Sequence, residues 1–384
     1  MAHKGKAKFS TLNGTLHGGT IAITWTRKRS KGEYDKIAAK PMRNFLTLLV
    51  LLCSALVIPA QSSAGTQLQI YFIDVEGGQS TLFVTPEGKS LLIDTGWAGN
   101  NSRDADRIAA AAKAAGIAKI DYVLITHFHD DHVGGVPQLV QRIPVGAFID
   151  HGPNRELTPD VNGNFDAYQK TLASGHYKRI IAKPGETLPI SGIHVQVISA
   201  DGKLIDKPLD GAGQPNEYCK ASETRPADQT ENARSVGVLM TFGKLRILDL
   251  GDLTWDKEMQ LMCPDNKLGK VDVLIVSHHG WNQSSSPALV DAIQARIAIM
   301  DNGAKKGGST PVLDTVRKAP GLETLWQLHF SEEGGTEHNT ADEYDANFSG
   351  GADQGNYLKL TASPDGSFAV FNSRTQQSKS YAAR

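Results

Sequence analysis

A chain of 384 residues is long enough to bury one large hydrophobic core or two smaller ones. Its composition, with 40% hydrophobic and 21% charged residues, excludes a disordered chain, a collagen and a coiled coil. Of 40 Lys and Arg and 41 Asp and Glu, ten basic and two acidic residues precede Gly65, which leaves 30 basic and 39 acidic residues after that point. This acidic balance disfavours tight binding to long nucleic acid.

The first 64 residues are expected to lie outside the fold. Residues 1–41 are polar, basic and without a pattern, which indicates an upstream or leader segment and a natural start at Met42. The basic start after Met42, the apolar run Phe45–Val57 and the small residues ending at Ala64 are typical of a secretory signal peptide. This run is shorter than the ~20 residues that span a bilayer. The sequence therefore predicts a cleaved signal over 42–64, a secreted or periplasmic protein and no permanent membrane span.

From Thr66 onward, strands come first and then alternate with helices. We expect strands over Leu68–Val75, Ser80–Thr85, Ser90–Asp94, Ile120–Ile125 and Gly146–Asp150, and helices over Arg103–Ala115 and Val133–Gln141. Residues 151–235 are rich in Gly, Pro, Asn and Asp, and predict a loop-rich insertion that shapes a pocket. This insertion has a helical piece near Phe165–Ala173 and a strand over His194–Ser199.

Regular elements return after residue 235. We expect a hairpin of Val236–Phe242 and Leu245–Leu250, helices near Trp255–Met262 and Pro287–Gln294, and strands over Val271–Val276, Ile297–Met300, Leu322–Leu328, Tyr357–Thr361 and Ser367–Phe371. Hairpins followed by alternating helices and strands predict an α/β fold with two mixed sheets face to face. Helices would cover the outer side of each sheet, which gives an αββα sandwich over residues 65–384.

Two cysteines, Cys219 and Cys263, follow the predicted signal peptide, and both lie in loop-like sequence. An even number of cysteines in an oxidising compartment predicts a disulfide. The alternative is two separate buried thiols.

The strongest chemical signal is the run His127-Phe-His129-Asp-Asp131-His132, directly after the predicted strand that ends at Ile125. Imidazole nitrogens and carboxylate oxygens are ligands that zinc prefers, and a tight loop at a strand end can turn several of them inward together. His127 and His129 could then hold one metal, and Asp131 and His132 a second. The alternative, a solvated polar loop, does not account for three His and two Asp within six residues.

Two further polar groups follow apolar strands in the same way. Asp252 comes after the strand over Leu245–Leu250, and the pair His278-His279 comes after the strand over Val271–Val276. A single Asp or His after a strand is more often structural, but these groups come in a fixed order behind the first. One of the two His is expected to bind metal, and His278 is preferred because it leaves the strand first.

This order of motifs resembles the metallo-β-lactamase superfamily over about Gln67–Phe371. The resemblance implies two divalent metal ions, zinc before manganese, with His127 and His129 on the first, Asp131, His132 and one of His278 and His279 on the second, and Asp252 between them. It also implies that Asp94, in Asp94-Thr-Gly96, supports the metal loop without binding metal. Asp131 and Asp252 would be the catalytic carboxylates.

Within the superfamily, Asp74-Val-Glu-Gly-Gly78-Gln-Ser80 and Ser-His-His-Gly280 resemble the branch that contains the hydrolase domain of the ComEC/Rec2 competence proteins. Bacterial phosphorylcholine esterases are similar. The Gly-Gln-Gly-Asp-Ser of that branch becomes Gly-Gly-Gln79-Ser80 here, which loses an acidic group. The usual third His of the first metal is also missing, and Asn232 is the candidate for its place, with a structural turn as the alternative. His338 lies in a late Gly-rich stretch and is a candidate metal or substrate contact.

The resemblance favours hydrolysis of a phosphoester, and the acidic chain favours a small or envelope-bound phosphodiester as the substrate. A lactone, a β-lactam or another carboxylic ester or amide is the alternative, because the same metal-generated hydroxide attacks carbonyl carbon. A secreted binding protein that keeps the metal fold without catalysis is the second alternative.

Overall fold

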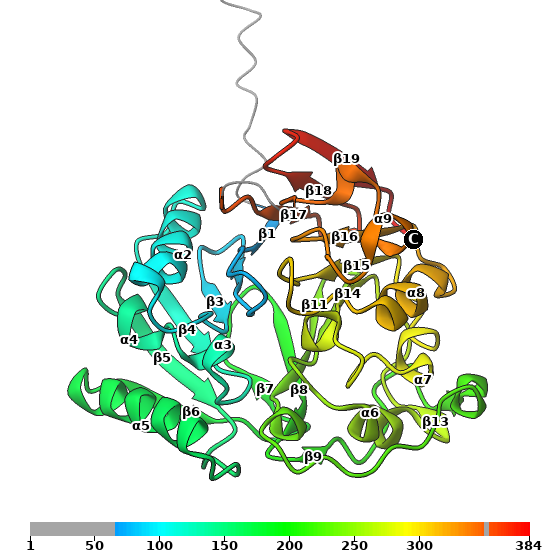
Figure 1. Ribbon diagram of the computed structural model, residues 1–384, viewed down its shortest axis with the longest axis horizontal. Coiled ribbons are helices and arrows are strands. Elements are labelled where there is room, and N and C mark those ends of the chain that lie inside the picture. Colours follow the sequence, from blue (N-terminus) through cyan, green and yellow to red (C-terminus); the bar gives the residue numbers. More distant parts are fainter. Residues whose placement is uncertain (1–65, 349–352) are drawn as a thin grey trace, which may run out of the picture. The chain divides into compact units, whose positions relative to one another are not determined.

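The computed structural model describes residues 66–348 and 353–384, so the predicted leader and signal peptide lie outside the described residues. The described residues belong to one compact unit. Two mixed β-sheets face each other in its middle, and helices cover the outer side of each sheet (Figure 1). The predicted αββα sandwich is therefore confirmed.

The first sheet contains nine of the described strands, six of them in the amino-terminal part of the unit and three at its end. Their spatial order is β19 (Gln377–Tyr381), β18 (Phe368–Asn372), β17 (Leu358–Ala362), β1 (Leu68–Phe72), β2 (Thr81–Val84), β3 (Ser90–Ile93), β4 (Ile120–Leu124), β5 (Val145–Asp150) and β6 (Lys178–Ile181). Pairing is antiparallel from β19 to β3 and parallel from β3 to β6. The strand β6 was not predicted, because its four residues include Lys and Arg and none is fully buried.

The second sheet has its antiparallel hairpin in the middle and a parallel half beside it. Its order is β16 (Thr324–Gln327), β15 (Ile297–Met300), β14 (Val273–Ile275), β12 (Leu245–Asp249), β11 (Gly237–Phe242), β8 (His194–Ala200) and β7 (Thr187–Leu188), with β9 (Lys203–Leu204) paired to β8. The strands from β12 to β16 are parallel, so their carboxyl ends lie at one edge of the sheet. A separate two-stranded pair joins β10 (Gln214–Pro215) to β13 (Asp265–Asn266).

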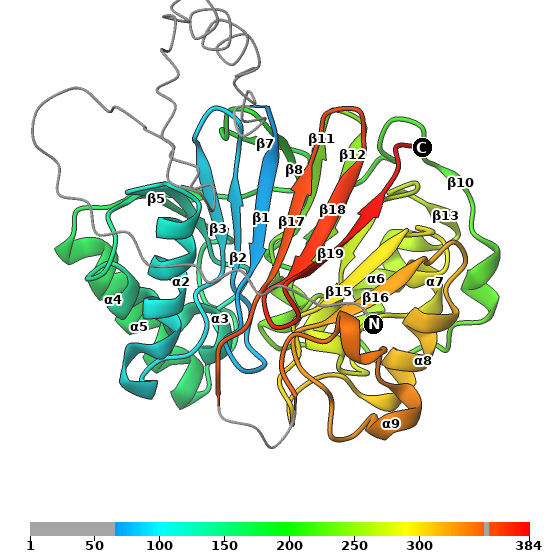
Figure 2. The same cartoon turned by 90° about the horizontal axis from the view of Figure 1, so that it is seen from above.

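The helices lie on the two outer flanks (Figure 2). On the first sheet they are α2 (Arg103–Ala114), α3 (Asp130–Val133), α4 (Val136–Leu139) and α5 (Pro159–Ser174). On the second sheet they are α6 (Trp255–Met262), α7 (Pro287–Val290), α8 (Thr310–Lys318) and α9 (Gly335–His338). Single 3₁₀ turns are η2 (Asn100–Ser102), η3 (Glu217–Lys220), η4 (Asn232–Arg234), η5 (Ser277–Gly280) and η6 (Asp342–Tyr344).

The helix predicted over Val133–Gln141 is instead divided into α3 and α4. Gly135 explains the division, because a Cβ atom there would lie 2.1 Å from the carbonyl oxygen of Thr95. The chain must pass Thr95 at this close approach before it can start the second helix. The division also keeps α3 short, so that its first turn stays beside the loop that carries His127 and His129.

Burial follows these layers. One hydrophobic cluster fills the space between the two sheets, and one further cluster lies under the helices of each flank. In α2 the buried residues Ala105, Ile108 and Ala112 recur at helical spacing, which is how a surface helix covers a sheet. None of the described helices combines the length and the apolar character that a membrane crossing requires.

Cys219 of η3 and Cys263, directly after α6, form a disulfide, which is the pairing expected from the sequence. The bond closes a loop across 44 positions of sequence. It ties the end of the loop-rich stretch 151–235 to the helical flank of the second sheet.

Candidate metal centre

Four loops meet at one edge between the sheets, and each follows a buried strand. They come after β3 with Asp94, after β4 with the run 126–132, after β12 with Asp252 and after β14 with η5. Each of these strands pairs in parallel with a neighbour, so its carboxyl end lies at the same edge as that of its neighbour. Local sequence thus places a polar group at each strand end, and the sheets bring the four groups together.

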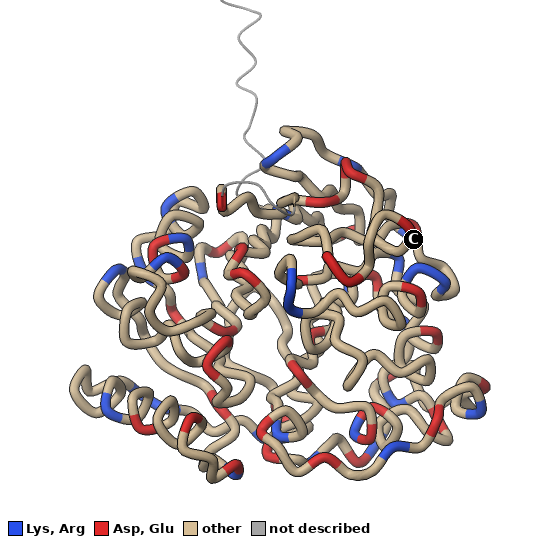
Figure 3. Tube along the Cα trace, viewed as in Figure 1, with Lys and Arg blue, Asp and Glu red and all other residues tan. Residues whose placement is uncertain are grey.

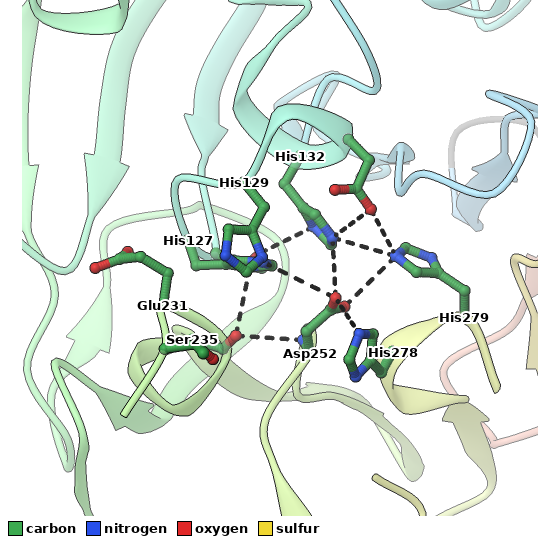
Figure 4. A network of polar contacts seen from close by, with 12 residues as sticks. His127, His129, His132, Glu231, Ser235, Asp252, His278 and His279 are labelled. Carbon is green, nitrogen blue, oxygen red and sulfur yellow. Dashed lines mark hydrogen bonds and ion pairs between the residues drawn. The ribbon is translucent and has the colours of Figure 1, made fainter. Parts of the chain in front are cut away.

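Asp131, His132, Asp252 and His279 form the tightest group, which we call the acidic half of the centre. All four are buried, and one ligand atom from each lies within 4.8 Å of the others. His132 Nε2 lies 3.3 Å from carboxylate oxygens of both Asp131 and Asp252, and 3.2 Å from His279 Nε2. Figure 4 shows Asp252 beneath the facing rings of His132 and His279. Nitrogen and oxygen donors at this spacing are those of a divalent metal site.

His127 and His129 form a second group beside the first, which we call the histidine half. Their ring centroids are 4.7 Å apart, and His127 Nε2 lies 3.9 Å from Asp252 Oδ2. His127 is fully buried, and its Nε2 atom has no hydrogen-bond partner among the described residues. Since a buried nitrogen without a partner is costly, this atom fits a metal ligand better than a structural His.

The charges of the acidic half fit a bound cation. Burial would raise the pKa of Asp252, but His278, His132 and His279 hold that pKa well below its ordinary value. Burial would lower the pKa of His132, but Asp252, Asp131 and Asp94 raise it well above its ordinary value. The buried carboxylates thus favour positive charge in the acidic half, and a divalent ion would meet the same attraction.

The histidine half has the opposite balance. Burial and the neighbouring His132 and His129 lower the pKa of His127 well below its ordinary value. A neutral imidazole is the form of His that binds a metal. The two halves together therefore suit two metal ions, with Asp252 between them.

Carboxylates hydrogen-bond to ring nitrogens of His132 and His129, and a third carboxylate lies near His279. Asp94 Oδ2 lies 2.7 Å from His132 Nδ1, Glu156 Oε2 lies 3.0 Å from His129 Nε2, and Asp301 Oδ1 lies 3.5 Å from His279 Nδ1. Such partners orient a metal-binding His and set its tautomer. The supporting position expected for Asp94 agrees with this geometry, and Asp94 also accepts hydrogen bonds from the backbone and hydroxyl of Thr126.

Glu156 and Asp301 were not predicted from the sequence as residues of the site. Asp301 directly follows the buried strand β15, so the pattern that identified Asp252 could have found it. Glu156 lies in an irregular loop after β5, and its sequence carries no comparable signal.

The two adjacent histidines of η5 have different neighbours. Both have positive φ angles, 55° at His278 and 53° at His279, so this turn projects the two rings in different directions. His279 belongs to the acidic half, whereas His278 contacts Asp252 at 3.3 Å and lies 3.5 Å from the Ser284 hydroxyl. The geometry therefore favours His279 over the expected His278 as the ligand of the acidic half.

Asn232 and His338 differ in position. Asn232 begins η4, is buried and has a side-chain oxygen without a hydrogen-bond partner among the described residues. Ser235 follows η4, and its hydroxyl lies 3.5 Å from His127 Nδ1 and accepts from the Asp252 amide (Figure 4). His338, by contrast, pairs with Asp314 of α8 at 2.7 Å. The structure thus brings the segment of Asn232 to the histidine half and places His338 on the helical flank.

Gln79, which replaces the acidic residue of the related branch, also has a defined place. Its side-chain amide donates to Asp249 Oδ2 at 2.7 Å, and its backbone amide donates to the Asp131 carbonyl at 3.1 Å. This loop therefore supports Asp131 from the outside. Burial raises the pKa of Asp249 to about 7, so this carboxyl group resists ionisation. An acidic residue in place of Gln79 would lie beside it.

Acidic and basic residues are interspersed along the described trace, and acidic segments lie near the middle of the view in Figure 3. This distribution agrees with the acidic balance of the sequence after Gly65.

Sequence comparisons relate part of this chain to a superfamily of metal-dependent hydrolases. Residues 74–213 match the model of the Metallo-beta-lactamase superfamily. The match includes the run from His127 to His132 and ends before Asp252 and η5.

Two relatives resemble a larger part of the chain. Recombination protein 2 of Haemophilus influenzae is 26% identical over 66% of this chain, and ComE operon protein 3 of Bacillus subtilis is 23% identical over 64%. The chain spans 26% and 29% of the length of these two relatives. A hydroxyacylglutathione hydrolase of Stenotrophomonas maltophilia is 29% identical over 28% of this chain and 37% of its own length.

Solved structures show weaker likeness. A Cronobacter sakazakii metallo-β-lactamase covers 48% of this chain and 60% of its own, with 17% identity and a TM-score of 0.30. A mutant of the CmlA β-hydroxylase covers 68% of this chain and 52% of its own, with 14% identity and a TM-score of 0.39. TM-scores this low carry no argument about function.

Metal binding should stabilise the fold. Adding Zn²⁺ to chelator-treated protein at about 100 times its Kd should raise the free energy of unfolding by about 2.7 kcal/mol, because the assembled ligands exist only in the folded state. Thermal unfolding with and without the metal measures this shift. His127→Ala should reduce the shift, whereas His338→Ala, a change outside the centre, should leave it intact. Equal midpoints with and without metal would contradict the assignment.

Proposed function

We propose that this protein is a secreted or periplasmic phosphodiesterase that uses two divalent metal ions, zinc before manganese. Its substrate would be a small or envelope-bound phosphodiester, and the signal peptide would be cleaved at about Ala64. The observation that carries the proposal is the position of Asp252. Its Oδ2 atom faces His127 at 3.9 Å, and its Oδ1 atom faces His279 at 3.6 Å, so one carboxylate lies between the two halves.

The chemistry of such a pair of ions suits phosphoesters. Paired divalent ions supply a hydroxide nucleophile at neutral pH and stabilise the attacking and leaving oxygens of an in-line displacement. His127 and His129 would hold the first ion, Asp131, His132 and His279 the second, and Asp252 would lie between both. Asp94, Glu156 and Asp301 would orient the histidines.

The protein's own residues would also manage the proton and the substrate. Asp131 has a low pKa, because His132 and Lys306 outweigh the effect of its burial, so it stays ionised and can accept a hydrogen bond from an attacking water. Lys306 forms an ion pair with the same carboxylate. Its positive charge lies where a phosphoryl oxygen would approach the centre.

Two features favour a phosphodiester over a carboxylic ester. The centre contains two buried carboxylates besides its histidines, and pairs of metal ions are common in enzymes that act on phosphoryl groups. The broader sequence likeness is to Recombination protein 2 and ComE operon protein 3, which extends over about two thirds of this chain. The shorter likeness to hydroxyacylglutathione hydrolases supports the alternative, a carboxylic ester or thioester.

The test compares three substrates with purified full-length protein supplied with Zn²⁺ or Mn²⁺. Bis-p-nitrophenyl phosphate reports phosphodiester hydrolysis, nitrocefin reports β-lactam hydrolysis, and a lactoyl thioester of glutathione reports carbonyl attack. Turnover of the phosphodiester well above the other two is expected. If only nitrocefin or the thioester were hydrolysed, the protein would instead be assigned to the alternative class, the hydrolases of carbonyl substrates. Two bound metals without turnover of any substrate would indicate a binding protein.

A further inference from the structure

A lysine between two tryptophans borders the metal centre, and we call this group of Trp97, Trp281 and Lys306 the rim. The Lys306 ammonium lies 4.9 Å from the ring centroid of Trp97 and 5.9 Å from that of Trp281. It pairs with Asp131 Oδ2 and donates to the Gly77 carbonyl at 2.8 Å. The rim therefore joins a cation and two flat rings to the acidic half of the centre.

The backbone holds Lys306 in this place. Gly303 N donates to the Lys306 carbonyl at 2.8 Å and closes a tight turn. Gly307 has a φ of +76°, and a Cβ atom there would lie 2.1 Å from the His279 carbonyl oxygen. The loop therefore packs closely against the turn that carries His279, and only glycine allows the two backbones to approach so closely. Lys306 is not a freely moving surface lysine.

Both tryptophans are partly open to solvent. Trp281 is 40% exposed, which is unusual for so large an apolar side chain, and its ring centroid lies 5.6 Å from that of His278. Trp97 is half-buried and follows the Asp94-Thr-Gly96 turn. Its indole nitrogen would be 3.1 Å from a Cβ atom at Gly78, so the loop after Asp74 packs directly beside the ring.

We propose that the rim is a substrate subsite for a phosphate ester that carries a flat aromatic or heteroaromatic group, as nucleotides do; this rests on the proposed phosphodiesterase function. An ammonium is a compact charge that suits a phosphate oxygen, and indole faces stack on planar rings. The ammonium has three N–H donors, and Asp131 and the Gly77 carbonyl take two of them, so one is available for the substrate. Lys306 is then a substrate-binding residue, and the two indoles select the substituent.

The charge and the rings make separate, testable contributions. A charge-assisted hydrogen bond from Lys306 would strengthen binding of any phosphate by about 10- to 100-fold. Stacking on Trp281 would strengthen binding only of a phosphate that carries a ring, by about 10-fold. The two effects distinguish a built subsite from a lysine that only supports Asp131.

Isothermal titration calorimetry with adenosine 5′-monophosphate and with inorganic phosphate tests this subsite in full-length protein loaded with Zn²⁺. Lys306→Gln should weaken the binding of both ligands by about 10-fold or more, and Lys306→Arg should restore most of it. Trp281→Leu should weaken the binding of the nucleotide alone. Lys305→Gln, a change at the exposed neighbouring lysine, is the matched control and should bind like the wild type. Thermal unfolding of each variant confirms folding.

Wild-type affinity for the nucleotide in folded Lys306→Gln and Trp281→Leu variants would overturn the subsite, whatever the activity. Failure of the proposed function would give a different result. Nucleotide binding would still depend on the rim, but no phosphodiester would be hydrolysed. A dinucleotide and a twenty-base oligonucleotide distinguish the two sources of such a ligand. Similar affinity for both would indicate that free nucleotides are the ligand of the subsite. Tighter, salt-dependent binding of the oligonucleotide would indicate that the ligand is the end of a nucleic acid chain.

Discussion

Asp252→Asn is expected to lower phosphodiester turnover by more than about 100-fold. Loss of a residue that only supports a metal ligand costs at most about 100-fold. Asp252 is 2% exposed, and its two oxygens face His127 of the histidine half and His279 of the acidic half. The amide keeps the size of the side chain but removes the negative charge that would hold two cations close together. The variant should also lose about one metal ion per chain. Metal analysis by mass spectrometry and turnover of bis-p-nitrophenyl phosphate measure the two effects.

Asp256→Asn is the matched control for this change. Asp256 lies four residues later, is also buried, and accepts a hydrogen bond from the Thr254 hydroxyl at 2.6 Å within α6. Its variant should keep the metal content and turnover of the wild type, even if its unfolding temperature changes. Full metal content together with full turnover in Asp252→Asn would show that this carboxylate does not lie between two ions.

Removal of the disulfide should destabilise the protein without removing its activity. The Cys219–Cys263 bond closes a loop across 44 positions, and the chain-entropy relation gives about 4 kcal/mol for a loop of this length. The double variant Cys219→Ser with Cys263→Ser should therefore unfold roughly 6 °C below the wild type, at ~2.1 cal/mol/K of unfolding entropy per residue. Differential scanning calorimetry measures this difference, and turnover at low temperature should stay close to the wild-type value.

A reducing agent provides the internal control for the disulfide. It should lower the unfolding temperature of the wild type toward that of the double variant and leave the variant itself unchanged. Equal unfolding temperatures for the oxidised wild type and the variant would show that the bond does not contribute to stability. A large loss of activity at low temperature would instead show that the bond positions the segment near η4 for the metal centre.

Much of the fold was predictable because its signals are local. Strands such as Leu245–Asp249 and Ile297–Met300 are short apolar runs bounded by turn residues, and α2 has its buried alanines at helical spacing. The helix α8 was missed, although Ser309 and Pro311 mark its start, because the Gly-rich sequence before it resembles a loop. The edge strand β19 was also missed, since four of its five residues are exposed or half-buried polar residues.

The sequence alone determined that candidate metal ligands lie at strand ends, because His127 to His132, Asp252 and His278-His279 each come shortly after a buried strand. It could not determine which of two adjacent histidines faces the acidic half, since that choice depends on two positive φ angles in η5. Nor could it show that Lys306 reaches Asp131, which lies 175 residues away. The spacing of hydrophobic residues and the polar residues at strand ends are local signals, which neighbouring residues carry. The direction of a His ring and the contact with a distant lysine are decided only when the sheets pack together.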